Sequence, residues 1–347
     1  MNSNVINSEE IKSNYTIDLI NLQFAKSIKE LEQFSILKVL RAIFYGFEIV
    51  KKVLIKKPDL VYFSLAPKGF AFYRDAYYVF LIKMLNRKIV FHLHGKGIKK
   101  NIENNFIKKN LYKRVFKNTQ VICLSETLSK DIADVYQGTP FIVHNGIREQ
   151  PFRRCAQTSI NKPVPQILYL SNYIKNKGIL ILIEALGILK NKGYDFTARF
   201  VGAPSNVSIE LLENLLNDLN LTARVKIIGP LHGDDKYLEF QNADIFVFPT
   251  YNDAFPLVTL EAMQFSLPVI STYEGSIPDI VINNQTGFLV EKENSRMLAE
   301  KIAVLLEDKE LRTKMGERGY ERFINNFTLR HFESSLQRAF EKILAAS

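Results

Sequence analysis

The stretch Pro249–Met263, PTYNDAFPLVTLEAM, combines two carboxylates with a proline that suits the start of a helix. Beyond that proline, the backbone N–H groups of Leu257 and Val258 would point out of the helix end, which attracts anions such as a diphosphate. Asp253 precedes the helix and Glu261 lies one turn inside it, and carboxylates are good acceptors for sugar hydroxyls. The stretch therefore fits a nucleotide sugar, with one acid on the transferred sugar and one on the ribose.

Taken alone, the two acids have a simpler interpretation, in which Asp253 caps the helix and Glu261 is a solvated helix residue. An ordered set of further motifs favours the ligand site. These motifs are Lys177-Gly178, Phe200-Val-Gly202, Gly229-Pro-Leu-His232, Leu267-Pro-Val-Ile-Ser271, Glu274-Gly-Ser276 and Gly287-Phe-Leu-Val290. Together with Phe91-His-Leu-His-Gly95 and Asn145-Gly146 in the first half, the set resembles glycosyltransferase family 4, whose fold is called GT-B.

The resemblance implies a role for each matching residue. Lys177 would hold the distal phosphate, His94 would contact the donor sugar near the reacting carbon, and Asp253 and Glu261 would bind hydroxyls. His92 is expected to point to the opposite sheet face and to be structural. The expected donor-binding residues are Asn172, Gly202, Leu231, Phe255, Pro256, Leu257 and Val258.

The chain departs from the family pattern at three places. Asp253 stands where the family usually has Glu, and Asn172 where it often has Arg. The sequence Met1–Glu10 resembles the end of the family's first helix, and Tyr15–Leu22 its second strand. The first strand and its Gly-rich loop are therefore expected to be absent, which would leave a truncated N-terminal domain.

The elements that must position these residues alternate along the chain, which is typical of βαβ units in a parallel sheet. Expected strands are Tyr15–Leu22, Leu60–Leu65, Lys88–Leu93, Gln120–Leu124, Phe141–Val143, Gln166–Leu170, Thr197–Val201, Val225–Ile228, Ile245–Phe248 and Val269–Ser271. Expected helices are Ile36–Lys57, Phe70–Leu85, Ile102–Phe116, Thr127–Tyr136, Ile179–Lys190, Ile209–Asn220, Leu257–Phe265, Ser295–Leu306 and Leu329–Ala345.

A polar, proline-containing stretch, Gln150–Pro165, reads as a linker between two domains, and a length of 347 residues fits that number. We expect an α/β protein with two Rossmann-like domains facing across a cleft. An acceptor-binding domain would cover residues 1–150 and a nucleotide-sugar-binding domain residues 151–327. A last helix, residues 328–347, would cross back to the first domain.

Composition and charge limit which kinds of site and partner the sequence is expected to have. Two distant cysteines indicate neither a disulfide framework nor a zinc site, and the polar N-terminus is not a signal peptide. Residues 1–150 hold 24 Lys/Arg and 13 Asp/Glu, a net charge of +11, whereas residues 151–347 hold 22 and 23. The basic, aromatic-rich stretch Lys96–Lys117 fits either an anionic membrane or a solvated face. It contains no recognised nucleic-acid module, so no nucleic-acid partner is expected.

The resemblance implies a retaining glycosyltransferase that moves a sugar from a nucleotide diphosphate sugar, such as a UDP-sugar, to a glycan or lipid-linked acceptor. Same-face attack would need no enzymic nucleophile, and neither a metal nor a cofactor is expected. Cell-surface polysaccharide synthesis is the expected process, in the cytoplasm or on the inner face of the membrane. Two alternatives stay open: a sugar-nucleotide epimerase of related fold, and an inactive nucleotide-binding remnant.

Overall fold

The structure is a computed structural model that describes residues 2–22, 36–150 and 164–346. It divides into two α/β units, the first made of Met1–Val143 with Glu333–Ser347 and the second of His144–Phe332. The sequence placed these divisions at residue 150 and after residue 327. Most of the expected linker lies outside the described residues.

The described part of unit 1 has a parallel sheet in the order β1-β2-β3-β4. Its strands are β1 (Leu60–Phe63), β2 (Lys88–Leu93), β3 (Gln120–Cys123) and β4 (Phe141–Ile142). The helices that belong to it are α1 (Asn2–Asn7), α2 (Glu9–Asn14), α4 (Ile36–Lys56), α5 (Gly69–Met84), α6 (Ile98–Ile102), α7 (Phe106–Phe116) and α8 (Glu126–Ser129).

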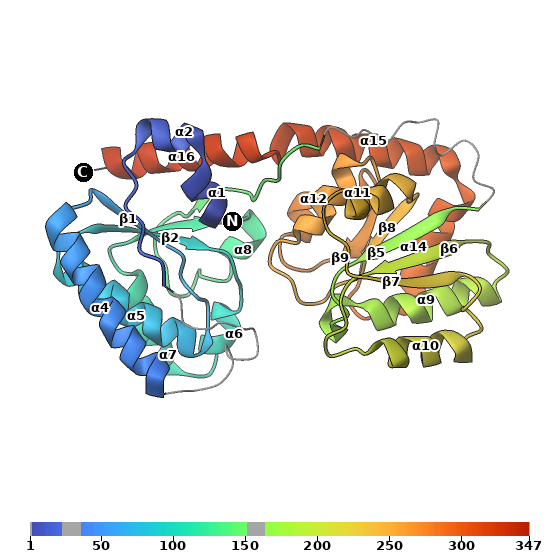
Figure 1. Cartoon of the computed structure of the whole chain (residues 1–347), viewed down its shortest axis with the longest axis horizontal. Coiled ribbons are helices and arrows are strands. Elements are labelled where there is room, and N and C mark those ends of the chain that lie inside the picture. Colours follow the sequence, from blue (N-terminus) through green and yellow to red (C-terminus); the bar gives the residue numbers. More distant parts are fainter. Residues whose placement is uncertain (1, 23–35, 151–163, 347) are drawn as a thin grey trace. The chain divides into compact units, whose positions relative to one another are not determined.

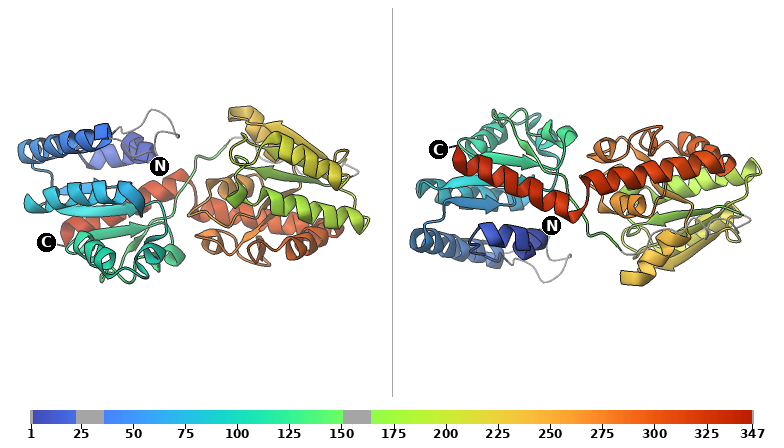
Figure 2. Two further views of the ribbon diagram at one scale, coloured as in Figure 1. Left: turned by 90° about the horizontal axis from the view of Figure 1, so that it is seen from below. Right: turned by 90° about the horizontal axis from the view of Figure 1, so that it is seen from above.

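Two layers of helices cover this sheet. Helices α4, α5 and α7 lie side by side on one face, and α16 (Leu329–Ala345) packs on the other with α2 (Figures 1 and 2). The core beneath α5 and α7 is aromatic, with Phe72 and Tyr112 stacked at a centroid distance of 3.6 Å. On the α16 side, Phe340 packs edge-on against Tyr62. The return of α16 thus covers the face that the crossover helices leave open.

Three expectations for unit 1 were wrong. The expected helix Thr127–Tyr136 ends at Ser129, where α8 ends, and mostly turns and bends follow it. Tyr15–Leu22 is not a strand: it runs without secondary structure, and the pairings of the described sheet do not include it. Ile20 and Leu22 touch the core and Leu19 O accepts a hydrogen bond from Lys52 Nζ at 2.8 Å, but a strand also requires a ladder of backbone partners. The expected helix Ile102–Phe116 begins only at Phe106, because Asn105 caps α7 by accepting a hydrogen bond from Lys108 N at 2.8 Å, and Ile102 is the last residue of α6.

Unit 2 has a six-stranded parallel sheet in the order β10-β9-β8-β5-β6-β7. Its strands are β5 (Gln166–Leu170), β6 (Thr197–Val201), β7 (Val225–Gly229), β8 (Ile245–Phe248), β9 (Val269–Thr272) and β10 (Gly287–Val290). Its helical elements are η2 (Lys175–Lys177), α9 (Ile179–Asn191), α10 (Ile209–Asp218), α11 (Gly233–Asn242), α12 (Leu257–Gln264), α13 (Ile277–Ile280), α14 (Ser295–Glu307) and α15 (Lys309–Asn326).

The strand order of unit 2 reverses beside β5. From β5 the chain moves outward through β6 to β7, then returns to β8 on the other side of β5 and continues to β9 and β10. In open α/β sheets, ligands bind outside the carboxyl ends of the strands at such a switch point. The loops that follow β5 and β8 are therefore the place to look for a site.

Candidate functional site

The loops after β5 and β8 touch each other at Gly178. Its φ of 81° lies in the left-handed region, and a Cβ added there would lie 2.1 Å from Pro249 O. Two further bonds join the loops, because Asn176 O accepts hydrogen bonds from Tyr251 N and from Thr250 Oγ1, each at 3.0 Å. Only glycine allows this approach, which brings the end of η2 against the loop that carries Asp253.

A short ion pair crosses the switch point. Lys177 Nζ lies 2.5 Å from Asp253 Oδ2 and also donates to Asn252 O at 3.3 Å. Both side chains are mostly shielded from solvent, with exposed fractions of 23% and 17%. The structure thus brings together a cation and an acid that are 76 positions apart in the sequence.

A buried acid behind Asp253 holds this loop in place. Glu274 Oε1 accepts a hydrogen bond from Asp253 N at 3.2 Å, and Glu274 is itself paired with Lys292. Gly275, with a φ of 52°, fits against the same loop, since a Cβ there would lie 2.3 Å from Asp253 O. The Glu274-Gly-Ser276 motif therefore holds the loop that carries Asp253 in position.

Helix α12 begins directly after this loop. Pro256 is its N-cap, and its carbonyl accepts a hydrogen bond from Thr259 Oγ1 at 2.6 Å. Leu257 and Val258 occupy the first turn, where backbone N–H groups have no acceptor within the helix. This end of α12 can therefore offer N–H groups and the positive end of the helix dipole to an anion.

Phe255, in contrast, is a packing residue. Its ring is buried against His144 and Phe327, with centroid distances of 6.2 and 6.3 Å. Its contribution to the expected donor site is to anchor the chain just before α12.

Glu261 forms the second ion pair of the region. Lys236 Nζ of α11 donates to Glu261 Oε1 at 2.7 Å, and the two side chains are 19% and 18% exposed. Sequence reasoning selected Glu261 and missed Lys236. No spacing rule marks a lysine 25 residues away on a different helix, so only the packing of α11 beside α12 reveals it.

The remaining expected donor residues lie on the other side of β5. Asn172 is exposed and its Oδ1 accepts from Ala203 N at 3.3 Å, which ties the end of β5 to the end of β6. Gly202 has no room for a side chain, because a Cβ would lie 1.9 Å from Ser171 O. Leu231 lies half-buried between β7 and α11. These residues border the carboxyl edge of the same sheet.

His94 belongs to unit 1, where it follows the last residue of β2. Both of its ring nitrogens are shielded from solvent, with no hydrogen-bond partner among the described residues. Burial lowers the pKa of His94 to about 4, so the imidazole is neutral at pH 7. A neutral, unpartnered imidazole at a strand end can donate or accept one hydrogen bond toward a ligand.

The expectation for His92 was wrong in its geometry. The rings of His92 and His94 pack together with centroids 4.0 Å apart, because residues two positions apart in a strand point to the same face. His92 is fully buried, and its Nδ1 lies 2.6 Å from the hydroxyl of Tyr62. His92 therefore packs against the His94 ring from the core side.

Asp131 fixes the loop that leaves His94. Its carboxylate accepts hydrogen bonds from the backbone N–H groups of Gly97, Ile98 and Lys99 at 2.7, 2.9 and 3.1 Å. The start of α6 therefore already has an anion, supplied by the chain itself. The sequence carries no motif that pairs Asp131 with this loop.

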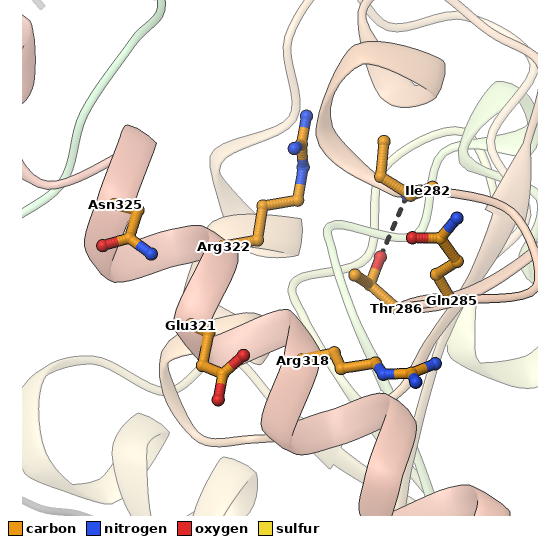
Figure 3. A pocket seen from close by; sticks show the side chains of 7 residues that line it. All are labelled: Ile282, Gln285, Thr286, Arg318, Glu321, Arg322 and Asn325. Carbon is orange, nitrogen blue, oxygen red and sulfur yellow. Dashed lines mark hydrogen bonds between the residues drawn. The ribbon is translucent and has the colours of Figure 1, made fainter.

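A hollow of about 620 Å³ in unit 2 lies elsewhere (Figure 3). Its lining comes from α15 and the turn before β10, namely Ile282, Gln285, Thr286, Arg318, Glu321, Arg322 and Asn325. None of the expected site residues lines it. Arg322 is already engaged, since it donates to the carbonyls of Asp279 and Ile280 at 2.7 and 2.8 Å. We therefore place the candidate site at the switch point.

Known proteins match the part of the chain that carries the ion pairs. Residues 154–322 match the family model of glycosyl transferases group 1. The capsular polysaccharide biosynthesis glycosyltransferase CapM of Staphylococcus aureus is 33% identical over 182 residues, which is 52% of this chain and 46% of CapM. The amylovoran biosynthesis glycosyltransferase AmsK of Erwinia amylovora is 27% identical over 237 residues, 65% of this chain and 56% of AmsK. The chain thus spans about half the length of these relatives.

Solved structures match across both units. A glycosyltransferase from Rickettsia africae ESF-5 superposes with a TM-score of 0.73 at 23% identity, covering 92% of this chain and 87% of that one. Anabaena Alr3699/HepE, solved in complex with UDP, superposes with a TM-score of 0.72 at 18% identity, covering 86% and 82%. With the two parallel sheets, these likenesses confirm the expected fold class.

Proposed function

Because residues 154–322 match the glycosyl transferases of group 1, we propose that the chain moves a sugar from a nucleotide diphosphate donor to a glycan or lipid-linked acceptor. The observation that carries the proposal is the Lys177–Asp253 pair, which crosses the switch point next to the amino end of α12. The cation and the helix end suit a diphosphate, and the carboxylate can accept hydrogen bonds from sugar hydroxyls. The names of CapM and AmsK support a role in the synthesis of a surface polysaccharide.

Donor binding would rearrange the ion pair. Asp253 is the present acceptor of the Lys177 ammonium, and a diphosphate at the end of α12 would compete for that ammonium. Once released, Asp253 could accept hydroxyl groups of the sugar. The complex of Anabaena HepE with UDP supports UDP as the nucleotide to test first.

Stabilisation of the leaving diphosphate would be the main catalytic contribution of unit 2. Negative charge grows on the leaving phosphate as the glycosidic bond breaks, and the Lys177 ammonium and the N–H groups of Leu257 and Val258 are fixed donors for that charge. Glu261, held by Lys236, would accept hydroxyl groups of the ribose. We propose that these groups suffice without a divalent metal, and that the anomeric configuration of the sugar is retained.

A thermal-shift screen with UDP-, GDP- and ADP-sugars tests donor binding, because a ligand that binds the native state raises the melting temperature. Donors that bind are then incubated with acceptor lipids or oligosaccharides, and the anomeric configuration of the product is read by NMR. Added EDTA should leave the rate unchanged. If no nucleotide shifts the melting temperature, the donor site is wrong.

The same assays separate the alternatives. Tight nucleotide binding without transfer to any acceptor would indicate an inactive nucleotide-binding protein. Release of an epimerised sugar without an acceptor would indicate an epimerase. Transfer of the sugar with retention supports the proposal.

A further inference from the structure

A second hollow, of about 330 Å³, lies in unit 1 where α5 and α7 end. These helices belong to successive βα units of a parallel sheet, so their carboxyl ends lie at the edge where β2 and β3 begin (Figure 1). His94 follows the last residue of β2 and therefore lies at the opposite edge of the sheet. The hollow is thus separate from the candidate site residue of unit 1.

Positive charge dominates the lining of this hollow. Four cations and two side-chain amides line it together with one phenylalanine ring, and none of its lining residues in the described ranges is an acid. We call it the cationic hollow, and its polar lining residues are Lys83, Asn86, Arg87, Arg114, Lys117 and Asn118. A concave surface lined by charges of one sign concentrates ions of the opposite sign.

Cations near helix carboxyl ends ordinarily offset the carbonyl groups that have no partner within the helix. Lys83 already does this for α7, because its Nζ donates to three carbonyls at the end of that helix at 2.6, 2.7 and 2.8 Å. The Thr119 hydroxyl donates to the carbonyl of Phe116 at 2.8 Å. The carbonyls at the end of α7 therefore do not require the other three cations.

Arg87, Arg114 and Lys117 are unengaged. Their side chains form no ion pair or hydrogen bond with any part of the chain that the structure describes, and the Arg87 Nε is also shielded from solvent. Burial, followed by repulsion from Lys117, lowers the pKa of Lys83 to about 8. A bound anion would supply the acceptor that Arg87 Nε lacks and would offset the repulsion between the two lysines.

We propose that the cationic hollow binds a compact anion with more than one phosphate group, for which inorganic diphosphate is the simplest probe. The guanidinium groups of Arg87 and Arg114 can each donate two N–H groups to phosphate oxygens, and Lys117 adds a compact charge. The amides of Asn86 and Asn118 can donate to further oxygens. Small-molecule pockets begin at about 300 Å³, so the hollow suits a diphosphate or a small phosphorylated molecule. This site does not rest on the proposed function.

Calorimetric titration of the full chain with inorganic diphosphate at physiological salt tests the site. The background is Lys177→Ala, because diphosphate could also bind at the switch point of unit 2. We expect saturable binding, at least tenfold tighter than that of orthophosphate. Arg87→Gln/Arg114→Gln should weaken it at least tenfold. The matched control Arg41→Gln/Lys100→Gln removes the same charge from two exposed cations outside the hollow and should bind within twofold of the background.

Unchanged thermal melting without ligand shows that both double variants fold. If Arg87→Gln/Arg114→Gln does not fold, Lys117→Gln at an exposed lysine gives the same test and should weaken binding at least fivefold. The proposal is overturned if the Lys177→Ala chain shows no saturable binding, if orthophosphate binds as tightly as diphosphate, or if the hollow variants bind like the background. Equal losses in the hollow variant and its control also overturn it, because net charge alone would then explain the binding.

Discussion

The two units handle their charged side chains in opposite ways. In unit 2, three cations near the candidate site are paired with acids: Lys177 with Asp253, Lys236 with Glu261, and Lys292 with Glu274. In unit 1, residues 36–117 carry nearly five cations for each acid, and many of these cations face solvent. Paired charges at a switch point are prepared for a small ligand that enters between them, whereas the cations of residues 36–117 outnumber the acids of that segment and cannot all be paired within it.

The sheets differ in the same sense. All four residues of β8 in unit 2 are buried, whereas all four residues of β1 in unit 1 are only half-buried, because β1 is the edge strand of the described sheet. The strand that leads into the Asp253 loop is therefore fully enclosed in the core of unit 2. Variants of charged and buried groups in each unit test this difference.

Removal of the Lys177 ammonium should have the largest effect. We expect Lys177→Ala to lower the transfer rate by about 10²–10³-fold, or about 3–4 kcal/mol, because one fixed donor to the leaving group is lost. The rate is measured at saturating donor and acceptor. Lys175→Ala, an exposed lysine in the same η2 turn, is the matched control and should stay close to wild type. Equal rates for both variants would show that the Lys177 ammonium of unit 2 does not contribute to catalysis.

The contact between the loops at Gly178 should contribute to the free energy of unfolding. Gly178→Ala forces a Cβ into the left-handed region and against Pro249 O, which should lower the free energy of unfolding by about 3 kcal/mol. Gly193→Ala is the control, since Gly193 has a φ of 83° but nothing within 4 Å. It should cost about 1 kcal/mol. Urea denaturation measures both, and equal losses would mean that the loops do not need to touch.

His94 gives unit 1 a pH-dependent stability. Burial lowers the pKa of its imidazole from the ordinary 6.5 to about 4. As the pH falls, the unfolded chain therefore binds the proton at a higher pH than the folded protein does. The contribution is full above pH 6.5 and is lost as the pH falls toward 4. After allowance for partial solvent access, it amounts to about 2 kcal/mol.

The variant His94→Asn should therefore flatten the acid limb of the stability curve between pH 6.5 and 4. Denaturant titrations at several pH values measure this slope. His92 remains in place in the variant, and its pKa is also lowered by burial, so part of the slope should persist. A slope equal to that of wild type would mean that His94 titrates normally in the folded protein.

The sequence predicts most strands, helices and ligand loops well, but it predicts the ion pairs poorly. The run Ile245–Phe248, four apolar residues before a loop of polar residues, already indicates a buried strand with a ligand loop at its end. Lys177, Asp253 and Glu261 follow from the order of the motifs. Lys236, Lys292 and Asp131 do not, because each meets its partner through packing of elements far apart in the chain. Tyr15–Leu22 has the composition of a strand, but composition does not provide a ladder partner.

The smallest expected effect concerns the second ion pair, and it asks whether Lys236 and Glu261 act as one unit. Loss of a partly buried, charged hydrogen bond should cost about 1.5 kcal/mol, so Lys236→Met and Glu261→Gln should each lower kcat/KM for the donor about tenfold. If Lys236 works only by orienting Glu261, the double variant should be no worse than either single variant. Glu300→Gln on the exposed side of α14 is the control for loss of an acid. Additive losses in the double variant would show that Lys236 contacts the donor directly, which would give unit 2 a second phosphate-binding cation beside Lys177.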